Sequence, residues 1–166
     1  MSTENDGERP VYRNRKYEPL IDKLCIRKNE HSEASLFKSN KDLMIFAAMV
    51  GHANNKKEQL EKNPMQIFLR VYISDEKDGF IYLLSLLEHE NANVLQTENL
   101  SQVIKLFEQY CNGGLSIIQS WLDANSSDLD GMETLAEKIL DQLVMISKEN
   151  NKIKADVSSE KLIGAG

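Results

Sequence analysis

Phe107-Glu-Gln-Tyr-Cys-Asn-Gly-Gly-Leu115 carries an apolar helical pattern up to a double glycine, and the pattern resumes at once in the residues that lead to Leu122. Each glycine inside a helix costs about 1 kcal/mol relative to alanine. The sequence therefore predicts a bend between two packed helices at Gly113 and Gly114, with a positive φ or a tight helix contact at one of them. A loop that cradles a phosphate is the alternative, although the glycines lack the lysine–serine pair of a phosphate-binding loop.

Further helical patterns surround this stretch. Apolar residues recur at steps of three and four from Tyr17 and again within 80–87, 100–111 and 132–148, and they fill almost all of 43–50. The helix at 43–50 is expected to be buried on most sides, with an N-cap at Ser39 or Asn40 and a C-cap at Gly51. Residues 67–73 are rich in β-branched and aromatic side chains, which predicts a strand that needs a partner.

We expect a mainly α, compact single helical domain of about five helices with a small β element near residues 66–73. The 166 residues are enough for one domain with tails. The expected organisation is a disordered leader at 1–11, a helical core domain at 12–124, a linker and C-terminal amphipathic helix at 125–148, and a disordered tail at 149–166. The sequence contains no run of about 18 apolar residues, so no membrane span is predicted. Its polar, acidic start does not resemble a signal peptide, and a cytoplasmic location is expected.

Neither cysteine suggests a metal or a nucleophile. Cys25 and Cys111 lie far apart, no CxxC motif is present, and both follow helical apolar spacing. Small core residues are the favoured interpretation, and neither a zinc site nor any other cofactor is expected.

An acidic cluster offers the alternative of a metal site. Asp75, Glu76 and Asp78 would have to supply oxygen ligands, but such sites need more converging ligands, and the start of a helix favours carboxylates in any case. A small metal-dependent nuclease using Asp75, Asp78 and Glu88 is the enzymatic alternative. No convincing set of converging polar residues supports it, so we do not expect an enzyme.

Charge is distributed unevenly along the chain. From Arg9 to Lys28 there are seven basic and two acidic residues, whereas from residue 63 onward there are eight basic and sixteen acidic ones. A basic front can steer toward DNA or an acidic partner, and tyrosines interleaved with arginines suit a nucleic-acid backbone or stacked bases. The candidate contacts are Arg13, Arg15, Lys16, Arg27, Lys28 and Lys41, with Lys38 as a further one.

Several of these segments together resemble one small bacterial family. The stretches that carry the resemblance are Arg9–Pro10, Tyr17–Leu20 with Leu24, Phe37, Lys41–Ala48 with Gly51, Asp78–Ile81 with Leu83 and Leu84, and Phe107–Leu115. They resemble the DNA-phosphorothioation-associated protein 4 family, small accessory proteins encoded beside Dnd-type DNA sulfur-modification and restriction systems. The resemblance covers about residues 9–122, so the last helix is expected to be specific to this chain.

The resemblance implies a setting in bacterial defence and supplies no catalytic residues. The expected function is that of a non-enzymatic accessory protein of a phosphorothioation-dependent modification or restriction system, acting as an adaptor for larger subunits or as a DNA-contacting helper. A DNA-binding transcriptional regulator and the small nuclease are the alternatives. Protein subunits of such a complex are the expected partners, DNA contact and a homo-oligomer remain open, and no membrane partner is expected.

Overall fold

The structure is a computed structural model that describes residues 6–25 and 35–163. Within these ranges the chain forms six α-helices, three short 3-10 helices and one two-stranded sheet. The prediction of a mainly helical, compact single domain with a small β element is confirmed.

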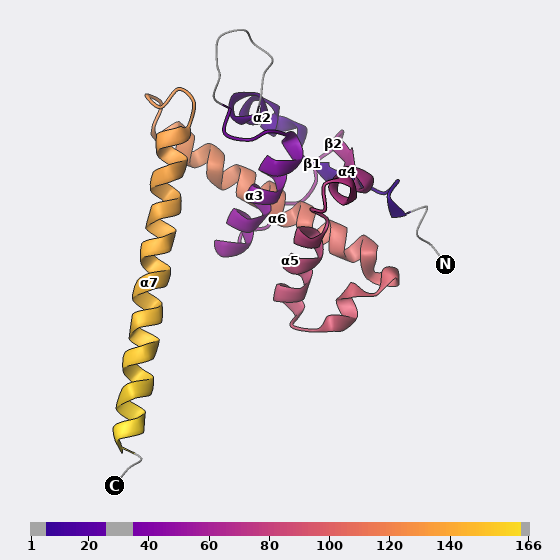
Figure 1. The fold of residues 1–166 in the computed structure, drawn as a ribbon. Helices are drawn as coiled ribbons and strands as arrows, with labels where there is room; N and C mark the ends of the chain where they lie inside the picture. Colours follow the sequence, from indigo (N-terminus) through magenta and orange to yellow (C-terminus); the bar gives the residue numbers. More distant parts are fainter. Residues whose placement is uncertain (1–5, 26–34, 164–166) are drawn as a thin grey trace.

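Figure 1 shows how the elements are arranged. In chain order they are β1 (Pro10–Arg13), η1 (Arg15–Tyr17), α2 (Glu18–Leu24), α3 (Asn40–Ala53), β2 (Met65–Phe68), α4 (Leu69–Ser74), α5 (Gly79–His89), η2 (Ala92–Leu95), η3 (Thr97–Asn99), α6 (Leu100–Ala124) and α7 (Met132–Ile163). As predicted, Ser39 caps α3, because its hydroxyl accepts a hydrogen bond from the Asp42 backbone N–H.

The crossing of α3 over α6 is the centre of the fold, and glycine makes it possible. A Cβ added to Gly114 would lie 1.7 Å from the Ala47 carbonyl oxygen, and one added to Gly51 would lie 2.0 Å from that of Tyr110. A Cβ on Gly113 would lie 2.0 Å from the Lys56 carbonyl oxygen. No side chain fits in these contacts, so the two backbones touch directly.

The predicted bend at Gly113 and Gly114 is wrong, whereas the tight helix contact is confirmed. α6 runs unbroken through both glycines, and neither has a positive φ. The close packing against α3 outweighs the intrinsic helix cost of glycine. The C-cap expected at Gly51 is wrong for the same reason, because α3 continues to Ala53 and uses Gly51 as a contact point.

The small sheet pairs β1 with β2 in antiparallel register, Pro10 opposite Phe68 and Arg13 opposite Met65. β1 begins inside the leader expected at 1–11, because Val11 is fully buried and anchors the strand in the core. The strand expected at 67–73 ends at Phe68, where the chain turns into α4. Residues 1–5 of the expected leader lie outside the described residues.

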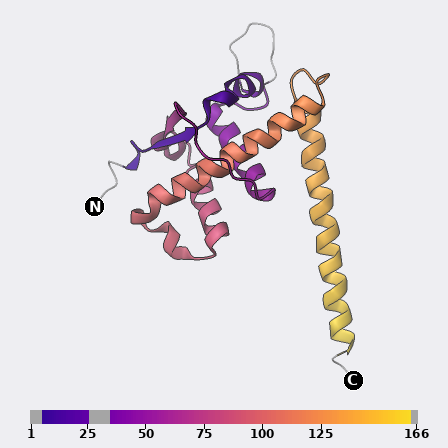
Figure 2. The same ribbon diagram turned by 180° about the vertical axis from the view of Figure 1, so that it is seen from behind.

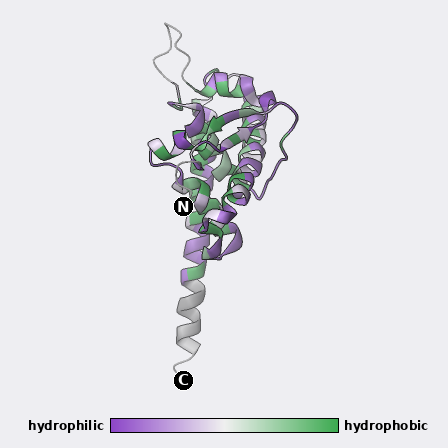
Figure 3. Ribbon diagram, turned by 90° about the vertical axis from the view of Figure 1, so that its right-hand side faces the viewer, coloured by the Kyte–Doolittle hydropathy of each residue, from purple (hydrophilic) through white to green (hydrophobic). Residues whose placement is uncertain are grey.

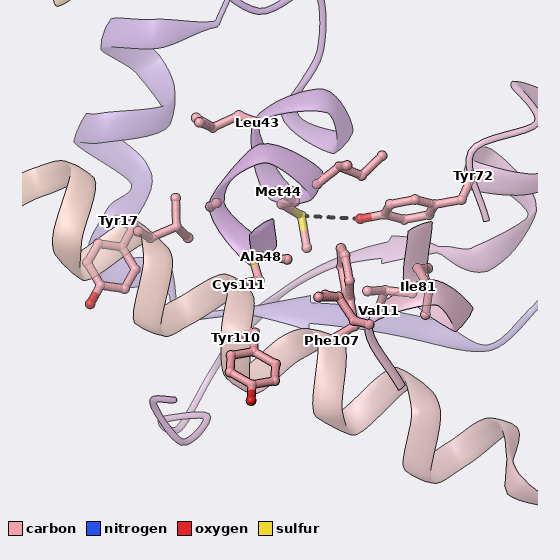
Figure 4. Packing of buried hydrophobic residues seen from close by; sticks show 14 of the residues in the cluster. Val11, Tyr17, Leu43, Met44, Ala48, Tyr72, Ile81, Phe107, Tyr110 and Cys111 are labelled. Carbon is pink, nitrogen blue, oxygen red and sulfur yellow. Dashed lines mark hydrogen bonds between the residues drawn. The ribbon is translucent and has the colours of Figure 1, made fainter. Parts of the chain in front are cut away.

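Side chains from β1, η1 and the six described α-helices contribute to the core, and Figure 4 shows part of it around the α3–α6 crossing. The Tyr72 hydroxyl donates a hydrogen bond to the Met44 sulfur at 3.4 Å, and Phe107 meets the Tyr72 ring edge-on. Cys111 is fully buried beside them as the predicted core residue, whereas Cys25 is only partly buried.

The last helix, α7, extends away from the body (Figures 1 and 2). It is attached at its start, where the Asp128 carboxylate accepts hydrogen bonds from the backbone N–H groups of Gly131 and Thr134 and where Leu135 is buried. The tail expected to be disordered from residue 149 is instead helical to Ile163, in line with the lack of glycine and proline in this stretch.

Candidate functional site

The basic front segment was the main candidate, and its Arg13 is structural. Arg13 is 1% exposed, and its guanidinium donates hydrogen bonds to the side chains of Asn40 at 3.1 Å and Glu18 at 2.8 Å. These bonds hold the Arg13 guanidinium inside the fold, so the predicted contact with DNA or an acidic partner would require the side chain to leave them. Its place in β1 turns the side chain inward, beneath the start of α3 and α2.

Lys16 is neutralised by two carboxylates of the segment that follows α3. Its ammonium contacts Glu58 at 2.8 Å and Glu61 at 2.5 Å, and these hydrogen bonds raise the Lys16 pKa. Burial acts to raise the pKa of Glu58, but hydrogen bonds from Lys16, Tyr17 and Asn14 lower it below its usual value. Lys16 therefore offers little net charge to an outside phosphate.

Two further candidates that the structure describes, Lys41 and Arg15, differ in their exposure. Lys41 is 4% exposed, and its ammonium donates to the Val71 carbonyl and pairs with Asp75, so the predicted contact with a partner would require it to give up these bonds. Arg15 is exposed, with its guanidinium Nε donating to the Asn63 carbonyl at 3.1 Å. Arg27 and Lys28 lie outside the described residues.

The acidic residues of the nuclease alternative serve other contacts. Asp75 pairs with Lys41, and Glu88 binds the Lys57 ammonium and the Tyr110 hydroxyl. Asp78 lies at the start of α5. Among the residues that the structure describes, no three histidine, cysteine, aspartate or glutamate side chains are placed to share a metal ion.

A buried glutamate on α6 was not singled out in the sequence. Glu108 is 5% exposed and accepts a hydrogen bond from the Tyr12 backbone N–H at 2.7 Å. Burial raises its pKa to about 7, although the hydrogen bond from Tyr12 and the charge of Lys105 act in the opposite direction. Glu108 thereby fastens β1 to α6 beside a groove of about 360 Å³ that Arg9 and Ser101 also line. In the sequence, the one indication of this burial was that Glu108 follows Phe107 of the apolar stripe.

The outer face of α5 is apolar and exposed. Its inner face buries Ile81 and Leu84 against the core, while Phe80, Leu83 and Leu87 are 42%, 41% and 50% exposed. These three side chains are spaced three and four residues apart, so they share one side of the helix. Figure 3 shows hydrophobic segments, coloured green, on several helices of the body.

A second apolar surface lies between α7 and the body. Phe46, Met49 and Trp121 form one wall of a groove of about 230 Å³, and Ile139 and Leu143 of α7 form the other.

None of the helices in the described ranges has both the length and the apolar composition needed to cross a membrane.

Comparison of the chain with known proteins identifies the family to which it belongs. No curated protein and no solved structure matches the chain. The family described as DNA sulphur modification system-associated protein 4 matches residues 11–161, so the expectation that the last helix is specific to this chain is wrong. The match spans most of the sequence, including α7, and the chain belongs to this family of proteins associated with DNA sulphur modification systems.

Proposed function

We propose that the chain is a non-enzymatic accessory subunit that docks onto a larger protein of a DNA sulphur modification system. Family membership supports the setting. The observation that carries the docking role is the outer face of α5, where Phe80, Leu83 and Leu87 lie exposed.

α5 is apolar on both of its sides, which is the pattern of a helix buried all round. Its inner side packs on the core, and the described residues of this chain leave its outer side in contact with solvent. A partner that covers this side would remove apolar surface from water, at about 25 cal/mol for each Å². Exposed apolar patches of this kind mark interaction sites in soluble proteins.

The charges at the ends of α5 indicate the chemistry of the partner. Glu76 precedes the helix, Glu90 follows it, and both are exposed. A partner surface with an apolar centre and a basic rim is complementary to this arrangement, and the opposite charges would speed association and fix its orientation. We therefore expect a protein partner rather than the phosphate backbone of DNA at this face.

Co-purification tests the proposal directly. The full chain carries an affinity tag and is expressed with the proteins encoded by the neighbouring sulphur-modification genes. The tagged chain is expected to recover one larger subunit in a constant ratio. Leu83→Asp should lower that recovery at least tenfold, because it places a charge in the centre of the apolar face.

Leu129→Asp is the matched control, because it makes the same change at an 86% exposed leucine in the loop before α7. It should recover the subunit as the unchanged chain does. Circular dichroism and thermal unfolding establish that both variants are folded. Equal recovery by Leu83→Asp and Leu129→Asp, or no recovered subunit with the unchanged chain, contradicts docking through α5.

A further inference from the structure

The far part of α7 buries little of its surface within the described chain. From Ile139 to Lys154 every residue of the helix is exposed, including Ile146 at 52% and Ile153 at 60%. A helix without tertiary packing is marginal in water, and most helical stability in proteins comes from burying an apolar face. The exposed side chains of α7 therefore require something to cover them.

The spacing of these side chains identifies the kind of partner. Steps of three and four alternate without interruption along Ala136, Ile139, Leu143, Ile146, Asn150 and Ile153. This is the spacing of the a and d positions of a two-helix coiled coil, with Ala136, Leu143 and Asn150 at a and the isoleucines at d. A second helix with the same repeat is the complementary surface.

Asn150 and its neighbours favour an identical helix in parallel orientation. A single asparagine at an a position fixes register and helix number, because it pairs with the asparagine of the partner. In an antiparallel pair it would face an apolar d residue and lose that hydrogen bond. Glu149 at g and Lys154 at the following e position have the opposite charges that stabilise a parallel pair of identical helices.

We propose that α7 pairs in parallel with α7 of a second copy of this chain, so that the protein is a two-fold homodimer. The stripe from Ile139 to Ile153 forms the seam. At its N-terminal end the partner helix lies across the mouth of the groove between α7 and α3, where Phe46 and Trp121 add apolar contacts. Leu143 at a with isoleucine at d would by itself favour larger assemblies, and Asn150 restricts the assembly to two copies.

Sedimentation equilibrium of the full chain over a range of concentrations tests the assembly. The expected mass is twice 18.9 kDa at high concentration. Ile146→Asp should raise the dissociation constant by about 100-fold or more, because it buries a charge in the seam. Val144→Asp is the matched control, since Val144 is 51% exposed but lies outside the stripe, and it should leave the dissociation constant nearly unchanged.

Cross-linking tests register and orientation independently of any effect of aspartate on folding. In a Cys25→Ser background, Asn150→Cys should form an intermolecular disulfide under mild oxidation, because residues at position a of the two helices face each other. Asn151→Cys, one position along, should not. A mass that stays at one copy, a particle of more than two copies, or cross-linking equal at both positions overturns the proposal.

This inference does not depend on the docking role of α5. The purified chain alone gives the mass and the cross-link, whereas co-purification needs the larger subunit. Dimerisation without recovery of a subunit would contradict only the proposed function, and recovery of a subunit by a monomer would contradict only the pairing of α7.

Discussion

Single atoms decide the packing of the two central helices. Gly114 and Gly51 are positions where an added Cβ would fall within 2.0 Å of a carbonyl oxygen of the opposite helix. The backbone on both sides belongs to regular helix, so the clash can be relieved only by moving α3 and α6 apart. That movement would disturb the core that they share.

Gly114→Ala should therefore destabilise the protein by about 3 kcal/mol or more, at the upper end of the cost of overpacking a core. Urea unfolding followed by circular dichroism measures the change. Gly79→Ala is the control, because nothing lies within 4 Å of its added Cβ. It should change stability by less than about 1 kcal/mol. Similar midpoints for Gly114→Ala and the unchanged chain would show that the helices separate without cost.

Arg13 gives a second contrast at this scale. Arg13→Ala should cost about 1–3 kcal/mol, because it removes a buried guanidinium that pairs with the partly exposed Glu18 and leaves Asn40 without its donor. Arg15→Ala, two residues further on, should cost less than about 0.5 kcal/mol because the side chain is exposed. Thermal unfolding of both variants distinguishes a structural Arg13 from a surface residue.

The sequence could identify these residues but not their surroundings. The helical spacing around Gly113 and Gly114 was readable, and so was the need for close contact. That α6 continues through them depends on Ala47 and Gly51 lying opposite, some sixty residues away. Likewise, the charge of Arg13 was visible, whereas its burial depends on β1 pairing with β2, a contact that local patterns do not specify.

At the scale of elements, the structure attaches β1 to α6 through Glu108. The carboxyl group is held in the core by one backbone hydrogen bond from Tyr12. Burial raises its pKa from 4.5 to about 7. The folded chain therefore keeps a proton that the unfolded chain loses between about pH 4.5 and 7, and stability falls as pH rises through this window.

The lost stability is on the order of 3 kcal/mol, since one unit of pKa corresponds to about 1.4 kcal/mol. Glu108→Gln should remove this dependence because the amide does not titrate. Urea unfolding of both proteins at about pH 5 and pH 8 gives the comparison. The lowered pKa values of Asp42 and Glu58 act in both proteins at lower pH and cancel in the difference. Parallel profiles for the two proteins would show that Glu108 is ionised in the fold.

Helix types were easier to anticipate than their ends. The stripes of α3, α5 and α6 were clear in the sequence because each has a buried side with regular spacing. The change from β2 to α4 at Leu69 was not, since the β-branched residues of 67–73 favour a strand and packing of Leu69 and Tyr72 in the core overrides that preference. α7 beyond Lys148 was missed because the residues that follow, Glu149 to Lys154, include Ile153 as their one large apolar residue.

For the whole molecule, the net charge is −6 and several cations of the front segment pair with carboxylates, so we expect few cations to be available for contact with DNA. Arg13, Lys16 and Lys41 are held by carboxylates, which leaves Arg15, Arg27 and Lys28 as the candidates of the front segment. If three phosphates are neutralised, the logarithm of the DNA-binding constant should fall with the logarithm of salt concentration with a slope of about −3.

Fluorescence anisotropy with a duplex oligonucleotide measures this slope, which should become shallower by about one unit in Arg15→Ala. Asp130→Asn, a change of one charge on the exposed loop before α7, is the control and should leave the slope unchanged. A slope near −6 would mean that the buried cations are released on binding, and an unchanged slope in Arg15→Ala would show that this residue does not touch phosphate.

The α3–α6 crossing has a consequence for genetic screens of this family. Gly51, Gly113 and Gly114 carry no reactive group, and yet almost any replacement at these positions adds atoms where the two backbones already touch. A saturation screen scored only by the activity of the sulphur modification system would therefore give them the profile of an active site. Measuring soluble protein for each variant in the same screen separates loss of fold from loss of function. Only positions whose variants stay soluble and yet lose function would point to the partner.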